Sequence, residues 1–125
     1  MLCSCDSNQN YSDCCRPFHS GVKPKTCEEL VRSRYSAYAL GLVDYIIETT
    51  HSKSRPEDLV TWREQIQAFC EQTEFTGLVI EEASSDKVTF YAHLKRGETD
   101  VSFREKSSFA EENGQLVYVE GMITR

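Results

Sequence analysis

The spacing of hydrophobic residues changes once along the chain, near residue 72, and this change constrains the fold more than any other feature. Before it, Leu59, Trp62, Ile66 and Phe69 recur at steps of three and four residues, as on one face of an α-helix. After it, four segments alternate with a period of two, which is typical of strands: "FTGLVIEEA", "KVTFYAHLK", "DVSFREKSSF" and "QLVYVEGMI". Helices followed by strands predict an α+β fold, with helices packed into a curved antiparallel sheet.

Turn-forming residues separate these four segments. They are Ser84-Ser85-Asp86, Gly97-Glu98 and Asn113-Gly114. Because each connection is short, we expect consecutive strands to pair as a four-stranded antiparallel meander.

Three helices are expected before the strands. Thr26 followed by Glu29 has the spacing of a capping box, which predicts a helix that begins at Cys27. Gly41 is expected to end it, before a short helix over residues 43–49. A third helix is predicted over residues 56–72, with Pro56 in its first turn. The preceding segment, residues 16–25, contains Pro17, Gly21 and Pro24 and is expected to be an extended linker.

Four of the six cysteines fall within the first fifteen residues, as Cys3-x-Cys5, eight residues, then Cys14-Cys15. Met1-Leu2-Cys3 resembles neither a secretory nor a lipoprotein signal, so we expect a cytoplasmic location, where thiols stay reduced. Clustered thiolates there favour a zinc site over disulfides. His19 is a competing fourth ligand, and an unstructured, oxidation-prone N-terminus is the alternative.

Composition argues against two classes of partner. The formal net charge is −6, from 14 Lys+Arg and 20 Asp+Glu, whereas a nucleic-acid surface is normally basic. No run of apolar residues approaches the roughly twenty that a membrane-spanning helix needs.

The segment "CSCDSNQNYSDCC" resembles the SEC-C motif, a small zinc module with the pattern Cys-x-Cys, eight residues, then Cys followed by His or Cys. The resemblance implies zinc as the cofactor and makes Cys3, Cys5, Cys14 and Cys15 its four ligands. The usual motif has glycines where this chain has Asp6 and Asn8. Both replacements still tolerate left-handed backbone geometry.

The resemblance extends beyond the cysteines. "RSRYSAYALGLVDYIIETTH", "REKSSF" and "GQLVYVEG" are similar to the YchJ-like family of bacterial proteins. Members join an N-terminal SEC-C module to a domain with the nuclear transport factor 2-like (NTF2-like) fold, a cone of helices in a strongly bent sheet. This implies a zinc knuckle over residues 1–20 and an NTF2-like α+β domain over residues 26–125. No particular activity comes with the resemblance.

One predicted strand carries a carboxylate on its apolar face. Val101, Phe103, Glu105, Ser107 and Phe109 alternate onto the same side. A buried charge is costly unless it is paired, and it is a candidate functional group.

Candidate partners for this carboxylate lie on the first helix. Arg32 or Arg34 could pair bidentately with Glu105, and Tyr35 and Tyr38 are expected beside them at the mouth of the cone. These residues define a possible pocket. Two interpretations stay open for it, a structural ion pair and a site for chemistry.

The expected function is that of a zinc-binding protein-interaction module with an unidentified protein partner. A closed four-thiolate site leaves no open position for metal catalysis, which favours this class. The alternative is a small-molecule-binding protein or enzyme that uses the cone around Glu105. An open polar cavity favours this alternative, whereas a cone plugged by Tyr35, Phe90 and Phe103 favours the interaction module.

Overall fold

The computed structural model describes residues 1–124. The helices are α1 (Arg16–His19), α2 (Cys27–Leu40), α3 (Val43–Glu48) and α4 (Leu59–Gln72), with 3₁₀ turns η1 (Tyr11–Asp13) and η2 (Ser52–Ser54). The strands are β1 (Glu74–Ala83), β2 (Lys87–Arg96), β3 (Thr99–Asp100), β4 (Phe103–Glu112) and β5 (Gln115–Thr124). This order of helices and then strands confirms the α+β class. No helix in the described part of the chain is long and apolar enough to cross a membrane.

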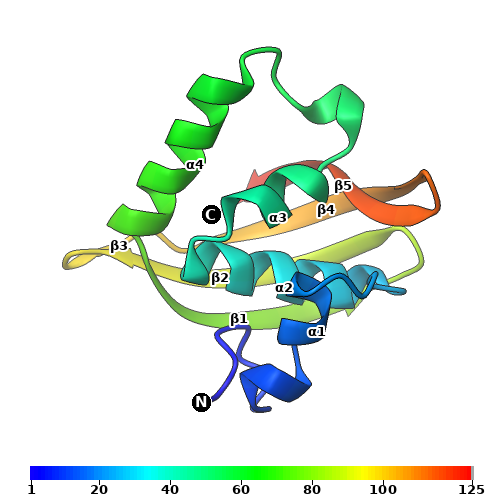
Figure 1. Cartoon of the computed structure of the whole chain (residues 1–125). Helices are drawn as coiled ribbons and strands as arrows, with labels where there is room; N and C mark the ends of the chain where they lie inside the picture. The colour runs from blue at the N-terminus through cyan, green and yellow to red at the C-terminus, as the bar shows by residue number, and fades with distance from the viewer. Residues whose placement is uncertain (125) are drawn as a thin grey trace.

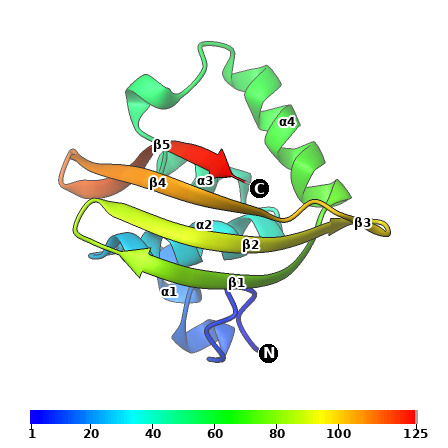
Figure 2. The same cartoon turned by 180° about the vertical axis from the view of Figure 1, so that it is seen from behind.

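The long strands form a bent antiparallel sheet in the order β1-β2-β4-β5, and the short β3 pairs with β2. Helices α2 and α3 lie against one face of this sheet, and α4 stands at its end (Figure 1). The view from behind shows the other face without a helix over it (Figure 2). The predicted meander is therefore confirmed, with β3 as an addition.

Local sequence signals explain most element boundaries. The Thr26 hydroxyl accepts a hydrogen bond from the Glu29 amide at 3.1 Å, and Glu29 accepts one from the Thr26 amide at 3.2 Å. This capping box starts α2 as predicted, and Gly41 ends it with φ 74°. At the β4–β5 turn, Asn113 and Gly114 have φ 53° and 79°, the positive values that a tight type I′ hairpin requires.

Two predicted boundaries were wrong. Helix α4 begins at Leu59, not at Pro56, because Asp58 caps it by accepting hydrogen bonds from the amide and hydroxyl of Thr61 at 3.0 and 2.7 Å. The expected extended linker contains the helical turn α1, with Pro17 in its first turn, where a missing amide hydrogen costs little.

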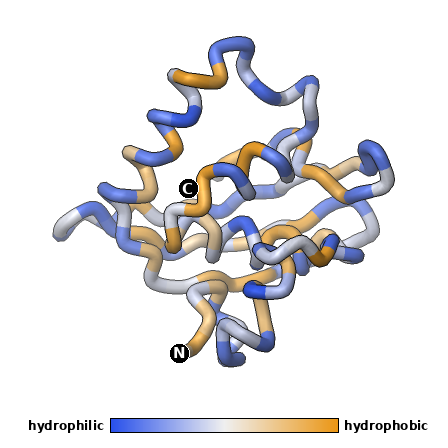
Figure 3. The backbone as a smooth tube through the Cα atoms, viewed as in Figure 1, coloured by the Kyte–Doolittle hydropathy of each residue, from blue (hydrophilic) through white to orange (hydrophobic). Residues whose placement is uncertain are grey.

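The interior has two hydrophobic clusters. The first joins α2 and the sheet and includes three of the N-terminal cysteines, Cys3, Cys5 and Cys15. The second lies among α2, α3 and α4 and is centred on Ala37, Ile46, Ile47 and Ile66. Along α4, hydrophobic and hydrophilic bands alternate, as expected for a helix with one buried face (Figure 3). The cysteine segment therefore packs onto the same core as the body of the protein.

Candidate metal centre and cone cavity

The structure brings the four N-terminal cysteines together. One Sγ atom from each of Cys3, Cys5, Cys14 and Cys15 lies within 4.8 Å of the others. The Cys5–Cys14 and Cys14–Cys15 Sγ distances are 3.5 and 3.9 Å. Thiolates at about 2.3 Å from a tetrahedral zinc ion lie about 3.8 Å apart, so the donor set fits such a metal. All six cysteines of the chain are free thiols.

The backbone between the two cysteine pairs turns back on itself. Asp6 and Asn8 adopt left-handed conformations, with φ 64° and 67°. The Cys3 amide donates to the Gln9 carbonyl oxygen at 2.8 Å, which closes the loop. The two positions where the usual motif has glycine thus require the backbone geometry that glycine would provide most easily.

The thiols of the cluster differ in acidity. Hydrogen bonding, first from Cys15, lowers the pKa of Cys5 to about 4, whereas burial raises the pKa of Cys14 to about 11. Cys3, Cys5 and Cys15 are buried, and only Cys14 is partly exposed.

His19, the competing ligand, lies outside the group of four thiols. Its Nδ1 is 2.7 Å from the Tyr11 hydroxyl and its Nε2 is 2.8 Å from the Ser33 carbonyl oxygen. With both ring nitrogens hydrogen-bonded, His19 connects the cysteine segment to α2.

Arg32 also connects the cysteine segment to α2 and does not line the cone. Its Nη1 donates to the Cys5 carbonyl oxygen at 2.9 Å, and its Nε donates to Glu28 at 3.1 Å. The amide of Leu78 on β1 donates to the Asp6 carboxylate at 3.4 Å. The cysteine cluster is thus attached to both the helix and the sheet.

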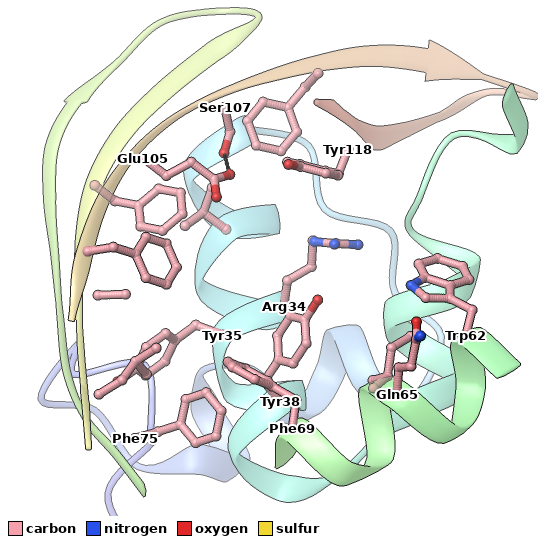
Figure 4. Close-up of a pocket in the computed structure, with 17 residues that line it drawn as sticks. Arg34, Tyr35, Tyr38, Trp62, Gln65, Phe69, Phe75, Glu105, Ser107 and Tyr118 are labelled. Carbon is pink, nitrogen blue, oxygen red and sulfur yellow. Dashed lines mark hydrogen bonds between the residues drawn. The ribbon is translucent and has the colours of Figure 1, made fainter. Parts of the chain in front are cut away.

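A cavity of about 380 Å³ lies inside the cone, between α2, α4 and the sheet. Nine of its lining residues are aromatic, and the predicted Arg34, Tyr35, Tyr38 and Glu105 are among them. Glu105 and Ser107 project from the sheet, Arg34 from α2, and Trp62 and Gln65 from α4 (Figure 4). Phe90 and Phe103 line the cavity without filling it.

Glu105 reaches the cavity because of a glycine on the neighbouring strand. A Cβ atom on Gly121 would clash with the Glu105 carboxylate, so a larger residue there would displace the carboxylate from this position. The Ser107 hydroxyl donates a hydrogen bond to Glu105 Oε2. The Tyr118 hydroxyl also lies close to this carboxylate.

The predicted pairing of Glu105 with an arginine was wrong within the described residues. Arg34 Nη1 instead donates to the Ile46 carbonyl and to the hydroxyls of Thr49 and Thr50, at 3.0, 2.7 and 3.1 Å. These acceptors gather at the carboxyl end of α3, where a helix dipole attracts a cation. The guanidinium carbon also lies 4.8 Å from the centre of the Tyr118 ring.

The tyrosines of the cavity have different roles. The Tyr35 hydroxyl donates to the Gly77 carbonyl at 2.7 Å and accepts from the Gly77 amide at 2.9 Å, so it holds the sheet. Burial raises the pKa of Tyr38, and burial with the nearby Glu105 carboxylate raises the pKa of Tyr118. Both therefore stay protonated at neutral pH.

Sequence reasoning missed Tyr118, Gln65 and Gly121. Simple alternation along β5 does not place Tyr118 in the cavity, because the β4–β5 register shifts beside it, whereas Trp62 lay on the predicted helical stripe. Nothing in the sequence marks Gly121 as the partner of Glu105, because their proximity depends on the register of β4 and β5.

The helices in a bent sheet, with a four-cysteine segment at the N-terminus, define an NTF2-like protein that carries a SEC-C-type cysteine pattern. The chain belongs to the YchJ family, since residues 26–121 match the family described as "YchJ, middle NTF2-like domain".

Related proteins agree with this assignment. A UPF0225 protein of Deinococcus radiodurans is 37% identical over 120 residues, covering 94% of this chain and 86% of the relative. The solution structure of a SEC-C motif containing protein from Rhodopseudomonas palustris is 32% identical, with a TM-score of 0.84 and full coverage of both chains. A crystal structure of a SEC-C motif containing protein from Psychrobacter arcticus shares the fold, with a TM-score of 0.71, 21% identity, and coverage of 96% and 76%.

Proposed function

We propose that the protein uses its cone to bind a small organic molecule and holds one zinc ion in Cys3, Cys5, Cys14 and Cys15 as a structural centre. The observation that carries the proposal is the aromatic cavity of about 380 Å³ with Arg34 and Glu105 on its wall. Ligand pockets are typically about 300–1,000 Å³, mostly apolar, with a few placed polar groups. The reduced cysteines fit a reducing compartment, and the proposal therefore includes a cytoplasmic location.

The zinc part of the proposal depends on the donor set. Four thiolates satisfy a tetrahedral ion completely, so the metal would order the chain and would not activate water or substrate. The segment from Met1 to Asp13 has little apolar surface to bury beyond its cysteines, and metal binding would supply the missing folding energy. Native mass spectrometry tests this, and we expect one zinc per chain that a chelator removes. Two disulfides, or another metal, would contradict it.

The ligand part can be tested with the protein's own fluorescence. Trp62 is the single tryptophan of the chain and lines the cavity. A molecule that enters the cone should change its emission and raise the melting temperature of the zinc-loaded protein. We expect Glu105→Gln to weaken that rise and leave the zinc in place. If no compound of a broad metabolite panel changes either signal, the cavity is not a binding site.

A protein-interaction role is a second candidate, favoured by two exposed apolar residues beside the cysteine cluster. Met1 and Leu2 are 84% and 59% exposed. A pull-down comparing the intact protein with a Leu2→Ser variant and a Cys14→Ser, Cys15→Ser double variant tests it. The interaction module predicts partners that both variants lose, and identical partner profiles would eliminate this candidate.

A further inference from the structure

Two polar groups of the cavity can form further hydrogen bonds: Arg34 as a donor and Glu105 as an acceptor. The three hydrogen bonds that Arg34 donates at the end of α3 all come from Nη1, and the Tyr38 hydroxyl is a further neighbour of the guanidinium, so Nε and Nη2 together keep donors for an occupant. Glu105 Oε2 accepts from the Ser107 hydroxyl and the Tyr118 hydroxyl lies near the carboxylate, which still keeps acceptor capacity for an occupant. The guanidinium lies between the sheet wall that carries Glu105 and the α4 wall that carries Trp62 (Figure 4). The cavity therefore offers both a cation and an anion to one occupant.

From this arrangement we infer the ligand class: a single-ring aromatic monocarboxylate that carries a hydroxyl group, with its carboxylate at Arg34 and its hydroxyl at Glu105. The inference rests on the proposed ligand-binding function of the cone.

The Arg34 guanidinium favours a ligand with a carboxylate. A guanidinium has a planar fork of donors that matches a carboxylate, and contacts with α3 and the Tyr118 ring hold Arg34 in place. Among residues 1–124, Arg34 is the single basic residue on the cavity wall, and Glu105 offsets its charge. A monoanion therefore leaves one net negative charge in this aromatic enclosure, whereas a doubly charged phosphate would leave two and is less favourable.

The Glu105 carboxylate determines which group the ligand carries at the end opposite its own carboxylate. A carboxylate only accepts hydrogen bonds, so the remaining acceptor capacity of Glu105 favours a ligand that carries a donor. The negative charge of Glu105 repels the ligand carboxylate, which fixes the orientation with the acid toward Arg34. A hydroxyl supplies the donor without adding a charge.

The aromatic wall selects the body of the ligand. Rings such as Phe90 and Phe103, whose centres are 6.5 Å apart at 62°, favour a flat aromatic guest through edge-to-face contacts. A volume of about 380 Å³ is near the lower end of the range for ligand pockets. One ring with a short side chain fits this space.

Matched probes test each element of this class with the zinc-loaded, full-length protein. The complete probes are 4-hydroxybenzoate, 4-hydroxyphenylacetate and 3-(4-hydroxyphenyl)propanoate, because three side-chain lengths sample the span between Arg34 and Glu105. Each is compared with the acid that lacks the hydroxyl and with the alcohol that replaces the carboxylate. Trp62 fluorescence and calorimetry measure the dissociation constants. At the best length, we expect loss of the carboxylate to weaken binding tenfold or more, and loss of the hydroxyl about fivefold.

Variants locate the two contacts. Glu105→Gln should remove most of the preference for the hydroxylated acid and leave the affinity for the deoxy acid nearly unchanged. Glu111→Gln is the matched control, because Glu111 lies exposed on the same strand. Arg34→Lys should weaken all acids and leave the alcohols unaffected, and circular dichroism checks that this variant is folded.

The outcomes separate the ligand class from the proposed function. Tighter binding of a neutral or phosphorylated compound, seen by Trp62, would overturn the ligand class and leave the binding function intact. Acid binding that Glu105→Gln and Arg34→Lys do not change would also overturn it. If neither these probes nor a metabolite panel perturbs Trp62, both the inference and the proposed function fail.

Discussion

Removal of one hydroxyl group, in Tyr35→Phe, tests whether the cavity wall is held as the structure describes. The Tyr35 side chain is 6% exposed and its hydroxyl contacts three backbone groups of the sheet. It donates to the Gly77 carbonyl at 2.7 Å, lies 3.2 Å from the His93 carbonyl, and accepts from the Gly77 amide at 2.9 Å. These contacts lie where the β1–β2 register shifts between Phe75 and Gly77. Phenylalanine keeps the ring packing and removes only these bonds.

The expected cost follows from the groups that remain. A buried donor or acceptor left without its partner costs about 1–3 kcal/mol, and here the Gly77 amide and carbonyl share one partner. We expect a loss of about 2–3 kcal/mol in the free energy of unfolding, which lowers the melting temperature by roughly 6–12 °C in a domain of this size. Urea unfolding at constant m-value measures the free energy, and hydrogen exchange at the Gly77 amide measures the local effect.

A matched control is Tyr45→Phe. The Tyr45 hydroxyl bonds a single side chain, Ser33, at 2.7 Å, so its removal should cost about 1 kcal/mol and leave Gly77 exchange unchanged. If Tyr35→Phe costs less than Tyr45→Phe while the Gly77 amide stays as protected as before, the proposed support of the wall is refuted.

Three further predictions address the glycine, the pH dependence and the metal. Gly121→Ala should displace the Glu105 carboxylate and lower the melting temperature, and calorimetry should show a loss of the preference for hydroxylated ligands. Burial raises the folded-state pKa of Tyr35 and Tyr45 to about 12, so the unfolded chain ionises first; urea unfolding should show stability falling as pH rises from about 10 to 12. Chelation should lower the melting temperature, increase proteolysis within residues 1–20, and weaken ligand binding at the cone.

The sequence predicted those features that depend on neighbours along the chain. The capping box of Thr26 and Glu29, and the positive φ angles of the Asn113-Gly114 turn, depend on a few adjacent residues. The alternation that places Phe103, Glu105 and Ser107 on one face also needs only the pleat of a strand. Each of these predictions was confirmed.

The arginine partner of Glu105 could not be predicted in the same way. Arg32 and Arg34 lie two positions apart on α2, about 200° around a helix, so only one of them can face the cone. Which one does depends on where the cysteine segment packs. The Cys5 carbonyl binds Arg32, and the carboxyl end of α3 holds Arg34 away from an ion pair with Glu105. Both acceptors are backbone groups whose positions come from the complete fold.

The same contacts imply that the cysteine cluster and the cavity are mechanically connected. One face of α2 bonds the cysteine segment through Arg32 and Ser33, and the neighbouring face lines the cone through Arg34 and Tyr35. On the sheet, Asp6 accepts from the amide next to Gly77, the residue that Tyr35 holds. An ordered cysteine loop thus restrains the helix and the strand that form two walls of the cavity. Because ordering those walls before a ligand arrives would lower the entropic cost of binding, a zinc ion held in the proposed site would contribute to ligand affinity at the cone even without a catalytic position.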